Sequence, residues 1–321
     1  MDECTWSRRD ALARTGVLVG AALVGKQLGF AVASEAPPAP GAPARFRYCL
    51  NMATLRGHKL GIAKEIQVAA EAGYDGIEPW VESIQAFVKS GGTLKELNQR
   101  VRDAGLTVEG AIGFPEWIVD DDARRAQGMD RARQEMDLVA QIGGRRFAAP
   151  PAGATGLPRL ELGKAAERYR SLLEAGQQIG LVPELELWGF SQNLGRLGEC
   201  VAVAMETGHP NACVLPDVFH LHKGNSDVRG MRLLGAGAIQ VLHLNDFPTD
   251  VPREKLDDSY RVYPGDGAAP LTEILRLLHG TGGPKVLSLE VFNRKYWAED
   301  ALAVAKTGLA KMKAAVAKAG L

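Results

Sequence analysis

The sequence carries no excess of charge, because its 38 Lys and Arg residues balance its 38 Asp and Glu residues. Proteins that bind nucleic acid or anionic membranes through bulk electrostatics rely on a positive excess. We therefore expect neither nucleic acid nor a membrane surface among the partners. Apolar residues make up 46% of the chain, which is the composition of an ordinary globular protein.

Cysteine is also scarce, with four residues in a chain of 321. Cys4, Cys49, Cys200 and Cys213 form no C-x-x-C pair, so a structural zinc knuckle is not expected. Their spacing gives no disulfide framework either. We expect the last three to be buried thiols, in a core that a chain of this length can build without metal or disulfides.

The apolar run at residues 16–24 is shorter than the roughly 20 residues that a membrane-spanning helix requires. It follows Arg8 and Arg9 and precedes a site of the form A-x-A at residues 31–33. This arrangement resembles a twin-arginine export signal, although Lys26 interrupts the apolar segment. A membrane anchor or a disordered tail is the alternative.

We accordingly predict a twin-arginine-type signal peptide over residues 1–33 and a Pro- and Ala-rich linker over residues 34–45. One folded domain would then extend over residues 46–321. The mature protein would be periplasmic or otherwise exported, without a membrane span.

From residue 46 onward, short apolar runs alternate with longer segments of helical periodicity. Several helical segments end in glycine, as at Gly73 and Gly180, which is a typical helix end. Eight strand–helix units match an α/β fold of the (β/α)8 or TIM barrel type, which takes about 250 residues. A doubly wound open sheet is the alternative, but the G-x-G-x-x-G turn typical of its first strand is missing. The predicted strands are residues 46–51, 74–80, 106–112, 146–149, 182–187, 211–216, 239–244 and 285–291.

A barrel enzyme works at the carboxyl ends of its strands, so polar residues there are candidates for chemistry. Glu186, Asp217, His243 and Glu290 end four consecutive predicted strands. Glu184 shares the face of Glu186, because side chains alternate along a strand, but Glu186 lies nearer the rim. Neighbouring strands lie about 4.8 Å apart, so the four side chains can converge on one point.

Carboxylates and one imidazole are suitable ligands for Mn²⁺, Mg²⁺, Co²⁺ or Zn²⁺. Without a cation, the clustered carboxylates would repel one another and their pKa values would rise. Each residue taken alone is more simply explained as a strand-end hydrogen-bonding or ion-pairing residue. Four such residues at the ends of four consecutive strands, all at a similar position along their strands, favour a metal site.

Six stretches match the motifs of one known superfamily in their order along the chain. The sequence resembles the xylose-isomerase-like barrels. Within them it is similar to the sugar phosphate isomerase/epimerase branch, which includes hydroxypyruvate isomerases, inosose-handling enzymes and ketose 3-epimerases. The resemblance covers residues 46 to 310. The matching stretches are AAEAGYDGIEPW, GLVPELELWGF, DVFHLHKG, HLNDFP, YRVYPGDGAAPLTEIL and VLSLEVFN.

The resemblance implies one divalent metal ion per chain, Mn²⁺ first, with Mg²⁺, Co²⁺ or Zn²⁺ as alternatives. Its ligands would be Glu186, Asp217, His243 and Glu290. The two glutamates of this set would also be catalytic, as acid and base on opposite faces of the substrate. Residues in the positions of His220 and Arg261 contact substrate oxygens in such enzymes, and Glu78 would line the pocket. A homodimer or homotetramer is also expected.

The chain departs from the family after its fifth predicted strand. The family often continues E-P-x-N there, whereas this chain reads Glu186-Leu187-Trp188-Gly189, so Trp188 would form an apolar wall of the substrate pocket. Asp246 would contact a substrate hydroxyl or support the metal ligands. Export is also unusual, because phosphorylated sugars belong to the cytoplasm. The expected partner is therefore an unphosphorylated small carbohydrate.

The predicted function is a metal-dependent isomerase or epimerase of a sugar, keto-sugar or cyclitol, working by proton transfer through an enediolate. A lyase of the dehydroshikimate dehydratase or 3-keto-glycoside-eliminating type would use the same residues, and only the product separates the two. A binding protein that has lost catalysis is a third alternative. An abasic-site endonuclease on this barrel is disfavoured, because its multi-metal site needs more than the six histidines present.

Overall fold

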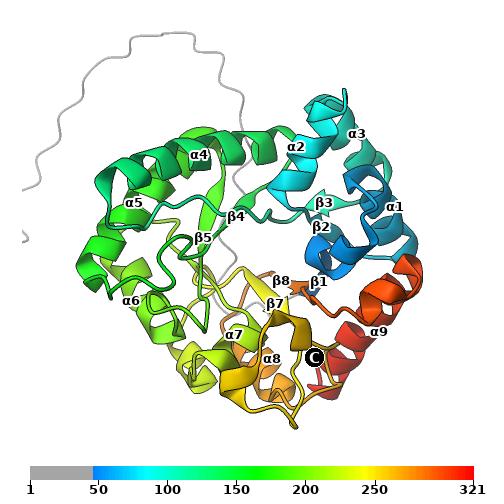
Figure 1. The fold of residues 1–321 in the computed structure, drawn as a ribbon. Coiled ribbons are helices and arrows are strands. Elements are labelled where there is room, and N and C mark those ends of the chain that lie inside the picture. Colours follow the sequence, from blue (N-terminus) through cyan, green and yellow to red (C-terminus); the bar gives the residue numbers. More distant parts are fainter. Residues whose placement is uncertain (1–45) are drawn as a thin grey trace, which may run out of the picture. The chain divides into compact units, whose positions relative to one another are not determined.

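The structure is a computed structural model that describes residues 46–321, in which eight parallel strands lie inside a ring of helices (Figure 1). The predicted signal peptide and linker lie outside the described residues. Each strand falls within one of the eight predicted ranges, so the predicted (β/α)8 barrel is confirmed. The strands are β1 (Phe46–Asn51), β2 (Gly76–Glu78), β3 (Thr107–Val108), β4 (Arg146–Ala149), β5 (Val182–Glu186), β6 (Val214–Leu215), β7 (Val241–Leu244) and β8 (Lys285–Leu289).

The strands pair in two runs, β3-β2-β1-β8-β7 and β4-β5-β6, and single contacts join these runs into a closed barrel. At one seam the backbone N–H of Ala148 donates to the carbonyl of Ala111 over 2.9 Å. At the other seam, isolated bridges pair Val214 with Ile239 and Asp217 with His243. The second of these bridges already places two candidate ligands side by side.

The helices cover the outside of the barrel and bury apolar side chains against the strands (Figure 1). Gly73 and Gly180 end α1 and α5 with φ values of 89° and 85°, the left-handed conformation that favours glycine. Within residues 46–321, no helix is long and apolar enough to cross a membrane. The helices are α1 (Ile62–Ala72), α2 (Val81–Lys89), α3 (Leu94–Asp103), α4 (Asp122–Gln141), α5 (Leu162–Ile179), α6 (Leu197–Glu206), α7 (Val218–Lys223), α8 (Leu271–Gly280) and α9 (Ala301–Lys318).

Because all the strands run in the same direction, their carboxyl ends meet at one rim of the barrel. Glu184 and Glu186 share one face of β5 but lie at different depths: Glu184 lies 3.7 Å from Arg146 in the barrel interior, whereas Glu186 lines the rim cavity. The predicted buried thiols are confirmed, since Cys49, Cys200 and Cys213 are free and buried.

Candidate active site at the carboxyl ends of the strands

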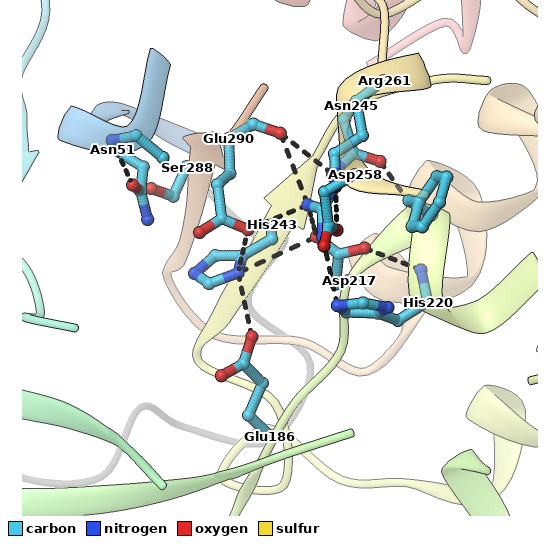
Figure 2. A network of polar contacts seen from close by, with 12 residues as sticks. Asn51, Glu186, Asp217, His220, His243, Asn245, Asp258, Arg261, Ser288 and Glu290 are labelled. Atoms are coloured by element: carbon cyan, nitrogen blue, oxygen red, sulfur yellow. Dashed lines mark hydrogen bonds and ion pairs between the residues drawn. The ribbon is translucent and has the colours of Figure 1, made fainter. Parts of the chain in front are cut away.

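The structure brings the four candidate ligands together around one imidazole. The Nδ1 atom of His243, in β7, lies 3.6 Å from Glu186 Oε1, 3.8 Å from Asp217 Oδ2 and 3.2 Å from Glu290 Oε2. Figure 2 shows the carboxylates of Glu186 and Glu290 approaching this ring from opposite sides. All four side chains are buried, so their charges act on one another with little screening by water.

The donor set fits a divalent cation. Within the described part of the chain, neither ring nitrogen of His243 has a hydrogen-bond partner, although carboxylate oxygens surround the ring. Glu186, His243 and Glu290 each offer one ligand atom, and these atoms lie within 4.8 Å of one another. Asp217 lies beside them as a fourth candidate. A cation would satisfy the unpartnered nitrogen and offset the mutual repulsion of the carboxylates.

Burial and neighbouring charges together raise the pKa values of both Glu186 and His243, for different reasons. Burial raises the pKa of Glu186 well above its usual range, and the charges of Glu290 and Asp217 add to the shift. Burial alone would lower the pKa of His243, but the charges of Glu290 and Glu78 outweigh it and raise that pKa well above the ordinary value.

Glu78 lies beneath the imidazole and is not among the residues that line the rim cavity, so the prediction that it lines the pocket needs correction. Its Oε2 atom is 3.0 Å from His243 Nε2 and accepts hydrogen bonds from Asn51 Nδ2 and Ser288 Oγ. Glu78 ends β2, and these contacts with β1, β7 and β8 hold its carboxylate against the Nε2 side of the His243 ring.

Arg261 enters the cluster from the loop between β7 and α8. Its Nη1 atom donates to Asp217 Oδ2 over 2.6 Å and to Glu290 Oε2 over 2.9 Å (Figure 2). Its Nε and Nη2 atoms donate to Asp258 Oδ1 over 3.0 and 2.7 Å. The side chain is 1% exposed, so these carboxylates compensate a fully buried positive charge.

His220 lies in the first turn of α7, where the carboxylate of Asp217 caps the helix and accepts a hydrogen bond from the His220 backbone N–H. Arg261 Nη2 lies 3.1 Å from His220 Nε2. Because a guanidinium can only donate, Nε2 accepts and the ring proton resides on Nδ1. Burial lowers the pKa of His220 to about 3, so the ring is neutral at ordinary pH.

A cavity of about 200 Å³ opens above the cluster. Glu186, Glu290, His220 and Arg261 line it. Trp188, which the sequence suggested as an apolar wall of the substrate pocket, also lies among the lining residues. The remaining lining residues are Trp80, Ile112, Phe114, Phe190, Asp258 and Phe292.

Asp246 is not brought to this cavity, in contrast to the expected contact with a substrate or with the metal ligands. Its Oδ1 atom accepts from the backbone N–H groups of Phe247 and Ala269, both over 2.8 Å, and its Oδ2 atom accepts from Gly265 over 3.0 Å. The chain turns back after Val262 and wraps this carboxylate in backbone amides, so Asp246 anchors the loop.

Sequence reasoning missed Asn245 and Asp258. Asn245 Nδ2 donates to Asp217 Oδ2 over 2.8 Å, and its Oδ1 accepts from the backbone N–H of Phe219. Its position two residues after His243, and so on the same face, was a usable signal. Asp258 carried no such signal, because its contact with Arg261 depends on the conformation of a loop.

Comparison with known proteins places this geometry in a family. Residues 66–315 match the family model described as xylose isomerase-like TIM barrel. The chain is 30% identical to an inosose isomerase of Halalkalibacterium halodurans over 81% of this chain and 94% of that protein. It is 25% identical to a fructoselysine 3-epimerase of Escherichia coli O157:H7 over 70% of this chain and 84% of that protein.

Two further similarities are to a dehydratase and to a solved structure. The chain is 24% identical to a 3-dehydroshikimate dehydratase of Pseudomonas aeruginosa over 77% of this chain, but over only 39% of that protein. The solved structure of an IolI protein with a bound zinc atom superposes with a TM-score of 0.78, at 20% identity over 85% of this chain and 98% of that one. This chain is therefore a member of the xylose isomerase-like TIM barrel family.

Proposed function

We propose that this protein is a divalent-metal-dependent isomerase or epimerase of a small, unphosphorylated sugar, keto-sugar or cyclitol. The observation that carries the proposal is the pair of carboxylates, Glu186 and Glu290, that face one cavity from opposite sides of the His243 ring. Similarity to an inosose isomerase and a fructoselysine 3-epimerase supports the same class of reaction.

Glu186, Asp217, His243 and Glu290 would hold the cation. Bound there, a divalent cation supplies positive charge beside a substrate carbonyl and so acidifies the neighbouring C–H bond. Zinc is the metal named for the IolI structure, whereas one imidazole with three carboxylates also suits Mn²⁺, Mg²⁺ or Co²⁺. We propose Mn²⁺ because oxygen ligands predominate in this set.

The two glutamates would move the proton. One carboxylate removes a proton from the carbon next to the carbonyl, and the other returns a proton from the opposite face or to the adjacent carbon. The neutral ring of His220 offers an N–H donor, and Arg261 offers positive charge, for orienting substrate oxygens.

The test is solvent exchange. Metal-loaded protein incubated in D₂O with a panel of keto-sugars and inososes should place deuterium on the carbon next to the carbonyl. The product should have the mass of the substrate apart from the deuterium. Metal bound stoichiometrically without exchange or turnover across the panel would contradict an enzyme of this class.

A lyase is the second candidate, because the chain is also similar to a 3-dehydroshikimate dehydratase. The same first step would remove a proton next to the carbonyl. The bond between the β-carbon and its oxygen would then break, and the second carboxylic acid would protonate the leaving oxygen. The products would be an unsaturated ketone and water or an alcohol, so the product mass separates the lyase from the isomerase.

We also propose that the protein is exported, on the support of the sequence of residues 1–33 alone. Replacing Arg8 and Arg9 by lysine should leave the precursor in the cytoplasm, because the twin-arginine address is read by a receptor. Fractionation of the producing cells tests this, and an unchanged periplasmic yield would remove the argument from export for an unphosphorylated substrate.

A further inference from the structure

The wall of the cavity opposite the carboxylates is a continuous series of aromatic rings. Phe292 contacts Trp80 at 6.1 Å between ring centroids, Trp80 contacts Phe114 at 5.2 Å, and Phe114 contacts Trp188 at 5.9 Å. Trp188 then stacks on Phe190 at 5.4 Å, with an angle of 26° between the rings. All five rings line the cavity, so a ligand meets an aromatic surface along this wall.

Phe190 is unusual among these rings because it is 50% exposed. It lies at the solvent end of the series and contacts the His220 ring at 5.7 Å. An exposed phenylalanine contributes little to folding, since half of its apolar surface stays in water. A bound ligand could cover the exposed surface of Phe190, because that surface lies beside the cavity.

The backbone around Gly189 holds Trp188 and Phe190 in place. A Cβ atom at Gly189 would lie 2.3 Å from the carbonyl oxygen of His220 and 2.4 Å from the backbone nitrogen of Gly224. Only glycine therefore allows this segment to press against the C-terminal turn of α7, where the Gly224 N–H donates to the His220 carbonyl over 2.9 Å. The Trp188 backbone N–H also donates to the carbonyl of Leu194. The two rings form a shelf that exists before any ligand binds, which limits the entropy lost on binding.

The cavity itself is too small for more than one sugar-sized ring. Its volume of about 200 Å³ lies below the 300 Å³ or so at which sites for larger ligands begin. Among the described residues that line it, the polar ones are Glu186, His220, Asp258, Arg261 and Glu290, all within the cluster and the arginine network. A group that extends out of the cavity therefore meets the shelf.

We infer that the substrate carries a ring substituent, either an aryl group or a second sugar ring, that leaves the cavity and stacks on Trp188 and Phe190. This inference rests on the proposed function, because it places the reacting keto-sugar ring beside Glu186 and Glu290. Aryl groups and sugar rings share the property that matters, a flat face of C–H or π character that packs on an aromatic ring. A simple monosaccharide would leave the shelf uncovered.

Binding of unreactive glycosides tests the inference. Methyl β-D-glucopyranoside, phenyl β-D-glucopyranoside and cellobiose share one ring and differ in its substituent, and the α-anomers form a second series. Titration of the Mn²⁺-loaded protein, followed by tryptophan fluorescence and saturation-transfer NMR, should show about 10-fold tighter binding of the ring-substituted compounds. Phe190→Ala should remove most of that difference, so the measured quantity is the ratio of the affinities for the ring-substituted and methyl glycosides in each protein.

The control is Met205→Ala, which removes a side chain that is 74% exposed on α6 and does not line this cavity. It should bind all the glycosides as the wild type does, and unchanged thermal unfolding would show that both variants fold. Equal binding of the three glycosides, no binding of any, or a preference that survives Phe190→Ala would overturn the inference. Deuterium exchange into unsubstituted keto-sugars tests the proposed function separately, so the failure of one is distinguishable from the failure of the other.

Discussion

The guanidinium of Arg261 lies 2.6 Å from the Oδ2 atom of Asp217, so a buried side-chain cation already stands beside a carboxylate proposed to hold a metal. The same Nη1 atom lies 2.9 Å from Glu290 Oε2. Arg261 therefore acts as an internal counter-ion, and a bound divalent cation would take over part of this role. Asp258 contacts the opposite side of the guanidinium. It would hold Arg261 in place when a cation binds Asp217 and Glu290.

Replacing Arg261 by Gln should make the metal-free protein less stable by roughly 3–5 kcal/mol, because it leaves buried carboxylates without their counter-charge. A divalent cation should then restore more stability to the variant than it adds to the wild type, since it supplies the missing charge. Thermal unfolding in EDTA and in Mn²⁺ measures both effects.

The control for this experiment is Arg253→Gln, which removes a partly exposed arginine of the same loop that contacts Asn225 and Glu254 and not the buried carboxylates. It should change neither the stability in EDTA nor the gain on adding Mn²⁺. If Mn²⁺ raised the stability of Arg261→Gln and of the wild type by the same amount, Arg261 and the cation would not share the same carboxylates.

Asp217 and Asp258 form a matched pair for testing the metal ligands, because both carboxylates accept hydrogen bonds from Arg261. Only Asp217 also lies against His243, with 3.8 Å between Oδ2 and Nδ1. Asp217→Ala should lose tight metal binding, because it removes a charged ligand from a set of four, whereas Asp258→Ala should keep it. Elemental analysis after dialysis provides the measurement, and full occupancy in Asp217→Ala would contradict its assignment as a ligand.

Glu186→Gln and Glu290→Gln should each lose turnover by roughly 10²–10⁴-fold while keeping the fold and some metal. Glutamine is nearly isosteric and offers an oxygen ligand, but it cannot act as a base near neutral pH. His220→Ala should instead raise KM and leave the metal content unchanged, because His220 lines the cavity outside the ligand set. Wild-type turnover in both glutamine variants would rule out the two-glutamate mechanism.

Alternation and strand order were enough to predict most of the site from the sequence. Glu184 and Glu186 share one face of β5 because side chains alternate, but only Glu186 lines the cavity, because it lies two residues nearer the carboxyl end of the strand. The closed barrel then brings Asp217 and His243 together across one seam, although 26 positions separate them in sequence. Parallel strands have a single carboxyl rim, so no detailed coordinates were needed for this step.

Hydrogen-bonding partners were not predictable in the same way. Glu78 and Asp246 both follow strands and were expected near a substrate, yet other groups engage their carboxylates. For Glu78 the partners are side chains of β1 and β8, and for Asp246 they are backbone amides of a returning loop. The pattern of residues along a strand does not predict these hydrogen-bonding partners. They depend on the stagger of neighbouring strands around the barrel and on the conformation of the loops.

Asp246 either stabilises the loop between β7 and α8 or contacts the substrate, and an alanine variant distinguishes these two roles. A carboxylate that accepts three backbone N–H groups should stabilise the loop between β7 and α8, so Asp246→Ala should lower the free energy of unfolding by roughly 2–4 kcal/mol. The tight wrapping of the loop supports a large effect, since a Cβ atom at Gly267 would lie 2.4 Å from Asp246 Oδ1. Asp250→Ala removes an exposed carboxylate from the same loop and should change stability little. Urea unfolding of the three proteins, with KM measured alongside, separates the roles. A raised KM in Asp246→Ala with unchanged stability would show that Asp246 contacts the substrate after all, and that the loop holds its conformation without it.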